Sequence, residues 1–102
     1  MTEQLNEQNF NEKTKEGLSI VDFWAPWCGP CRMQGPIIDE LSEELTDVNV
    51  YKVNVDENQN LAAQYGVMSI PTMFIMQDGQ VKETLVGLHQ KEDLQRILNQ
   101  YR

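Results

Sequence analysis

The sequence lacks a long apolar run and lacks a basic segment at its start. No stretch of the 102 residues approaches the ~20 apolar residues of a membrane-spanning helix. The first residues, MTEQLNEQNF, do not have the basic and apolar regions of a secretory signal peptide. We therefore expect a cytoplasmic protein that does not associate with a membrane.

Positive charge is also scarce. Eight Lys and Arg residues stand against sixteen Asp and Glu residues, which gives a net charge of −8 at pH 7. Such a charge repels the phosphates of nucleic acids and the headgroups of anionic lipids. We therefore expect no nucleic-acid partner, and the acidity itself is typical of a solvated surface.

Cysteine and histidine, the usual ligands of structural zinc, are few. The chain has only two cysteines, Cys28 and Cys31, and one histidine, His89. A structural zinc site needs four ligands, commonly two cysteine pairs or one pair with two histidines. We therefore expect no complete metal site within this chain, although a site shared with another chain stays open.

A purely structural disulfide between the two cysteines is a weak explanation for the pair. It would close a ring of only four residues, for which chain entropy gives about 2 kcal/mol, against about 3 kcal/mol for a fifteen-residue loop. A reducing cytosol also tends to break such a bond unless turnover re-forms it. A redox centre is the favoured interpretation, with the structural bond and the shared metal site as alternatives.

The rare side chains that are present gather in WAPWCGPC, at 24–31, between a predicted strand and a predicted helix. The β-branched and aromatic run at 17–25 is typical of a buried strand. Apolar residues then recur at helical spacing over 29–46. Pro30 fits the first turn of that helix, where its missing N–H costs nothing.

This position gives the two cysteines different chemistry. Cys28 lies at the helix N-terminus, where unpaired N–H groups and the helix dipole favour the thiolate. Cys31 lies one turn later on the same side, close enough to pair and more shielded. We expect Cys28 to attack a substrate disulfide and Cys31 to resolve the mixed disulfide.

The rest of the pattern predicts a single α/β domain over residues 1–102. We expect strands at 48–56, 72–76 and 80–86, helices at 58–66 and around the apolar residues at 94–101, a first helix ending near Gly17, and a short edge strand within residues 1–6. A helix crossover makes strands 17–25 and 48–56 parallel. Asp78-Gly79 is typical of a tight hairpin turn, so the sheet should be mixed.

Asp22 interrupts an otherwise apolar strand. An ionised carboxylate is costly there unless it is paired. One interpretation is a side chain that faces solvent, because strand residues alternate between two faces. The other is a buried carboxylate with a raised pKa that serves as a proton acceptor.

The segments VDFWAPWCGPC, VDEN, SIPT and DG…VG resemble the thioredoxin family in sequence and spacing, across almost the whole chain. The resemblance implies a thioredoxin fold, with a five-stranded mixed β-sheet flanked by four helices. It also implies a general protein-disulfide reductase that exchanges dithiol and disulfide through Cys-Gly-Pro-Cys without a bound cofactor. Its partners would be disulfide-containing client proteins and an NADPH-dependent thioredoxin reductase, and we expect a monomer.

The same resemblance implies roles for further residues. Gly29 and Pro30 would tune the redox poise. Asp22 would take the proton from Cys31, through water, and Lys52 in the adjacent strand would neighbour that carboxylate. The substrate would dock on Trp27, Ile70, Pro71, Val86 and Gly87. The loop before strand 72–76 would lie against the attacking cysteine, with a cis bond before the proline and the backbone of Ile70 pairing with the substrate.

Two other functions stay open. A disulfide oxidase or isomerase would share the cysteine pair, although the Gly-Pro dipeptide argues against it. A binding module in a larger complex would use only the docking surface. One departure from the family concerns Gln34-Gly35, which stands where an apolar pair is more usual and puts the packing of helix 29–46 in question.

Overall fold

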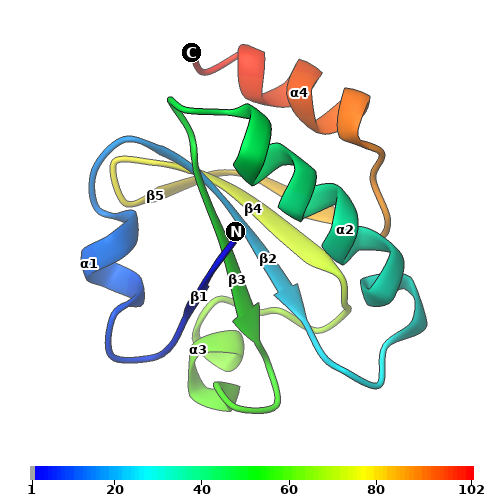
Figure 1. The fold of residues 1–102 in the computed structure, drawn as a ribbon. Coiled ribbons are helices and arrows are strands. Elements are labelled where there is room, and N and C mark those ends of the chain that lie inside the picture. The colour runs from blue at the N-terminus through cyan, green and yellow to red at the C-terminus, as the bar shows by residue number, and fades with distance from the viewer. Residues whose placement is uncertain (1) are drawn as a thin grey trace.

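The apolar runs form one mixed β-sheet in a computed structural model that describes residues 2–102 (Figure 1). The strands are β1 (Glu3–Leu5), β2 (Leu18–Trp24), β3 (Asn49–Asn54), β4 (Thr72–Gln77) and β5 (Gln80–Val86), in the order β1-β3-β2-β4-β5. β3 is parallel to β1 and β2, while β4 is antiparallel to β2 and β5. The mixed sheet and the edge strand within residues 1–6 are confirmed, and Met1 lies outside the described residues.

Helices cover both faces of this sheet. They are α1 (Phe10–Thr14), α2 (Gly29–Glu44), α3 (Gln59–Gln64) and α4 (Lys91–Asn99). α2 and α4 pack on one face, and α1 and α3 pack on the other (Figure 1). α2 continues through Pro36, which removes one backbone hydrogen bond without ending the helix. None of the helices formed by residues 2–102 is long and apolar enough to cross a membrane.

The alternation of side chains along β2 determines what each face of the sheet contains. Leu18 and Ile20 belong to the apolar cluster that includes the buried residues of α2 and α4. Val21 and Phe23 belong to the cluster on the side of α1 and α3. Because successive strand residues point to opposite faces, Asp22 shares the face of Leu18 and Ile20 and points toward α2.

The turn between β4 and β5 has the predicted hairpin geometry. Asp78 has a φ of 51° and Gly79 a φ of 84°, so both central residues adopt the left-handed conformation that a two-residue turn requires. The Asp78 side chain also accepts a hydrogen bond from the N–H of Gly17, with an N···O distance of 2.8 Å. The hairpin is therefore tied to the residue that precedes β2.

The N-terminus of α3 is capped from elsewhere in the chain. Asn58 occupies the N-cap position, at the start of the predicted helix 58–66, but within residues 2–102 its side chain makes no capping bond. Glu7 instead accepts hydrogen bonds from the N–H groups of Asn60 and Leu61, at 2.9 and 3.2 Å. The Asn58 side chain bonds to the backbones of Glu7 and Asn54, which holds the segment before α1 against α3.

Candidate active site

Cys28 lies where the chain leaves β2 and enters α2. It is the N-cap of the helix, with extended φ and ψ of −90° and 114°, and Pro30 lies in the first turn. The N–H of Cys31 donates to Cys28 Sγ at an N···S distance of 3.3 Å. A helix N-terminus therefore directs a backbone donor at this sulfur, which favours its thiolate once the bond to Cys31 is reduced.

The two cysteines form a disulfide bond, with Cα atoms 5.2 Å apart. Their exposure does not differ in the predicted way, because Cys28 is 5 % exposed and Cys31 is 4 % exposed. Both sulfurs pack with Ala25 and Ile70 at the end of the sheet. The structural distinction between the two cysteines is thus the capping position of Cys28, and not a difference in burial.

Asp22 is fully buried, so the solvent-facing interpretation of this residue is wrong. Neither carboxylate oxygen has a hydrogen-bond partner within residues 2–102. Burial raises the pKa of Asp22 from 3.8 to about 7, while the charge of Lys52 opposes the rise and that of Asp39 adds to it. A carboxyl group with a pKa near neutrality can take up and release a proton under physiological conditions.

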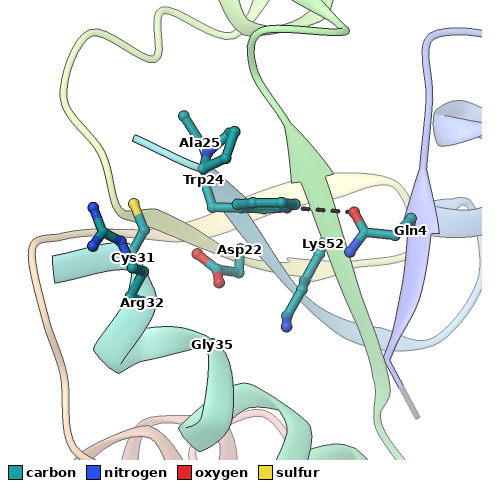
Figure 2. A pocket seen from close by; sticks show the side chains of 9 residues that line it. Gln4, Asp22, Trp24, Ala25, Cys31, Arg32, Gly35 and Lys52 are labelled. Carbon is teal, nitrogen blue, oxygen red and sulfur yellow. Dashed lines mark hydrogen bonds between the residues drawn. The ribbon is translucent and has the colours of Figure 1, made fainter. Parts of the chain in front are cut away.

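A pocket of about 220 Å³ joins Asp22 to the redox centre. Cys31 and Arg32 of α2 line one side, Lys52 of β3 lines the other, and the Asp22 carboxyl group points in from the sheet between them (Figure 2). The indole of Trp24 crosses this pocket and donates to the Gln4 side chain at 3.3 Å. The pocket has both polar and apolar walls and has room for water beside its polar groups.

Lys52 is the neighbour of Asp22 in the sheet but does not bond to it. The Cα positions of Asp22 and Lys52 pair across β2 and β3. The Lys52 ammonium instead forms an ion pair with Asp39 of α2, at an N···O distance of 3.1 Å. Asp39 is absent from the candidates that the sequence provides, because the contact depends on how α2 lies over β3.

The loop before β4 lies against Cys28, as the family resemblance implies. The Ile70–Pro71 peptide bond is cis, and the Ile70 carbonyl oxygen lies 3.7 Å from Cys28 Sγ. The N–H of Gly87 donates to the Pro71 carbonyl at 2.8 Å. Segments that are distant in the sequence therefore meet beside the Cys28 sulfur.

The expected docking residues differ in how much surface they present. Trp27 is 66 % exposed and Val86 is 61 % exposed, while Ile70 and Gly87 are half-buried. Pro71 is buried, because it directly precedes the buried strand β4. Its ring therefore does not form part of the apolar surface. The Trp27 indole donates to Asp56 at 2.9 Å, which fixes the ring beside the cysteines.

Gln34 is the buried polar residue that connects α2 to the loop after β5. It is fully buried, its amide donates to the His89 carbonyl at 3.0 Å, and its carbonyl accepts from the His89 N–H at 2.8 Å. His89 Nδ1 lies 2.8 Å from the Gly87 carbonyl. The question about the packing of α2 is thus resolved, because the buried Gln34 side chain is hydrogen-bonded to the backbone of His89.

We expect Gln34→Leu to lower the free energy of unfolding by about 1–3 kcal/mol, because a buried backbone group that loses its partner costs this much. Urea denaturation of the oxidised protein measures the change. Gln64→Leu, at an exposed position of α3, is the matched control and should change little. Equal stability of the wild type and Gln34→Leu would contradict the pairing.

The chain was compared with known proteins. A model of the thioredoxin family matches residues 1–100. The chain is 50 % identical over 96 residues to a thioredoxin of Bacillus subtilis (strain 168), covering 93 % of this chain and 92 % of that protein. It is 44 % identical over 102 residues to a thioredoxin of Listeria monocytogenes, covering 99 % of each. A solved structure, a mutant thioredoxin from Halobacterium salinarum NRC-1, matches with a TM-score of 0.90 and 35 % identity, over 98 % of this chain and 89 % of that one.

Proposed function

Because the chain belongs to the thioredoxin family, and is therefore a protein-disulfide oxidoreductase, we propose that it is a general reductase of protein disulfides. The observation that carries this proposal is the Cys28–Cys31 disulfide at the N-terminus of α2, beside a buried Asp22 that has no hydrogen-bond partner within residues 2–102. The reduced Cys28 and Cys31 thiols donate the electrons of the reaction, and the Cys28–Cys31 disulfide is the oxidised form that they leave behind.

Cys28 performs the first step. Its thiolate attacks one sulfur of the client disulfide, the client S–S bond breaks, and the released client thiolate takes a proton from water. The product is a mixed disulfide between Cys28 and the client. The N–H of Cys31, which donates to Cys28 Sγ at 3.3 Å, lowers the cost of the thiolate before the attack.

Cys31 and Asp22 perform the second step. The Asp22 carboxylate accepts the Cys31 proton through water in the shared pocket, and the Cys31 thiolate attacks Cys28 Sγ. The mixed disulfide breaks, and the second client sulfur leaves as a thiolate that becomes protonated. Two electrons have then passed to the client, and Cys28 and Cys31 are joined.

The client docks around Cys28 in this proposal. Trp27, Ile70, Val86 and Gly87 provide a partly apolar surface, and the backbone of Ile70 pairs with the client chain. The buried Pro71 fixes the loop instead of contacting the client, and Gly29 and Pro30 set the redox poise. An NADPH-dependent thioredoxin reductase restores the dithiol, and Lys52 adjusts the charge near Asp22.

Reduction of insulin disulfides tests the proposal. With NADPH and a thioredoxin reductase, the wild type should consume NADPH in proportion to the insulin disulfides broken, and Cys28→Ser should not. A measured redox potential distinguishes a reductase from an oxidase, whose potential would be higher. Insulin reduction by Cys28→Ser at the wild-type rate would contradict the proposal.

Limited alkylation tests the roles of the two cysteines. We expect iodoacetamide to modify Cys28 of the reduced protein about tenfold faster than Cys31 at pH 7, because the helix N-terminus favours its thiolate. Peptide mapping by mass spectrometry measures the two rates, and the same reaction in denaturant should equalise them. Faster modification of Cys31 in the folded protein would reverse the assignment.

A further inference from the structure

Lys52 neighbours two carboxylates, those of Asp22 and Asp39, and within residues 2–102 its ammonium group bonds to Asp39 and not to Asp22. Lys52 pairs in register with Asp22, and the oxygens of Asp22 have no hydrogen-bond partner within residues 2–102. Lys52 Nζ lies instead 3.1 Å from Asp39 Oδ1. Figure 2 shows the Lys52 side chain extending from β3 toward α2 rather than toward the Asp22 carboxyl group.

Two neighbours favour this position of the ammonium group. The Thr2 hydroxyl donates to the same Asp39 oxygen, so the carboxylate is held in place from the N-terminal side. Lys52 Nζ lies 3.5 Å from where a Cβ on Gly35 would be, an ordinary contact distance, so the ammonium group packs directly beside α2 at this glycine. Although partial burial of Asp39 opposes ionisation, hydrogen bonds from Thr2 and Lys52 hold its pKa below 3.8.

We propose that Asp39 is a positioning residue that holds the Lys52 ammonium group away from Asp22 and so preserves Asp22 as a proton acceptor at neutral pH. The inference rests on the proposed function, in which Asp22 takes the proton of Cys31. Asp39 acts through Lys52 and does not contact the reacting sulfurs in this account.

The charges around Asp22 explain the expected effect. α2 contributes Cys31, Arg32 and Asp39 to this side of the sheet, and β3 contributes Lys52. The neighbours from β1 and β4, Gln4 and Met73, are uncharged. If Asp39 is neutral, Lys52 loses its ion-pair partner, and its charge still acts on Asp22. An opposite charge within a few ångströms stabilises the ionised carboxylate, which makes it a weaker base for a thiol.

The test is a ¹³C NMR titration of the Asp22 carboxyl group in the oxidised protein. We expect Asp39→Asn to lower the midpoint by about one pH unit, the lower end of the effect of a nearby opposite charge. Glu43→Gln is the matched control, because it removes the same charge from an exposed position of the same helix, and it should leave the midpoint unchanged.

A second pair of variants, made in a protein without Lys52, separates two effects of Asp39 on Asp22. One is the positioning of the Lys52 ammonium group, and the other is the direct repulsion between the Asp39 and Asp22 charges. In a Lys52→Met protein, Asp39→Asn should lower the Asp22 midpoint by clearly less than it does in the wild type, because no ammonium group remains to be released. An unchanged midpoint in Asp39→Asn, or equal shifts in both backgrounds, would overturn the inference. The oxidised protein does not turn over, so this titration fails or succeeds independently of the insulin assay.

Discussion

Cys31→Ser is expected to convert the protein from a catalyst into a covalent trap for its clients. The first step needs only the Cys28 thiolate and an accessible client disulfide, so the mixed disulfide still forms. Its resolution needs a second thiolate near Cys28 Sγ, and a serine hydroxyl is not ionised at neutral pH. Turnover with NADPH and thioredoxin reductase should therefore fall to background, while one client molecule accumulates on each protein.

Non-reducing gels of cell extract measure this outcome. Cys31→Ser should give adducts that dithiothreitol releases, and the double variant Cys28→Ser with Cys31→Ser should give none. The alternatives forecast other results. Loss of a structural disulfide would destabilise the fold without capturing clients, and a binding module would retain its function in both variants. A folded Cys31→Ser protein that captures no oxidised client would count against the exchange mechanism.

Asp22→Asn is expected to stabilise the protein in a pH-dependent way. The pKa of Asp22 is about 7 in the folded protein, against 3.8 for an ordinary aspartate, so the folded state binds more protons between these values. Wild-type stability therefore falls as pH rises through this window. The neutral amide has no such dependence, and its advantage should grow from near zero at pH 4 to about 4 kcal/mol at pH 8.

Urea denaturation across this pH range measures the difference. Asp93→Asn is the matched control, because Asp93 lies exposed on α4, and its effect should stay below about 0.5 kcal/mol. Equal pH dependence of the wild type and Asp22→Asn would mean that Asp22 is ionised in the folded protein throughout the window, contrary to its burial with no hydrogen-bond partner among the residues that the structure describes.

The same substitution is expected to slow the second chemical step. The amide cannot accept the Cys31 proton, and loss of a general base costs about a hundredfold or more in rate at neutral pH. Stopped-flow measurement of mixed-disulfide resolution should show a wild-type rate that rises with a midpoint near pH 7, and the variant should lack this rise. Identical pH–rate profiles would remove Asp22 from the mechanism.

The reactive segment can be predicted from sequence because its geometry is local. Cys28 follows a strand directly, and Pro30 allows a helix to begin there, so the capping position follows from adjacent residues. The sequence leaves the burial of Asp22 open, and the structure decides it because β2 is buried on both faces of the sheet. The hairpin turn at Asp78 and Gly79 can be predicted for the same reason as the reactive segment, because it depends only on these two adjacent residues.

The features that the sequence does not predict depend on contacts between distant segments. Asp39 reaches Lys52 only because α2 crosses β3, and Gln34 bonds to a loop that lies 55 residues later in the chain. Glu7 caps α3 from a distant segment of the chain for the same reason. The burial of Pro71 and the similar exposure of Cys28 and Cys31 also result from tertiary packing, which residue type alone does not determine.

Mass spectrometry of a single turnover tests the central claim most directly. The reduced protein is mixed with an equimolar amount of a client that contains one disulfide. The reaction is quenched with acid, and the masses of both proteins are measured. The account predicts that the protein loses two hydrogen atoms and forms the Cys28–Cys31 disulfide for each client disulfide that gains them. Client reduction without formation of this disulfide, or no client reduction by the folded dithiol protein, would contradict it.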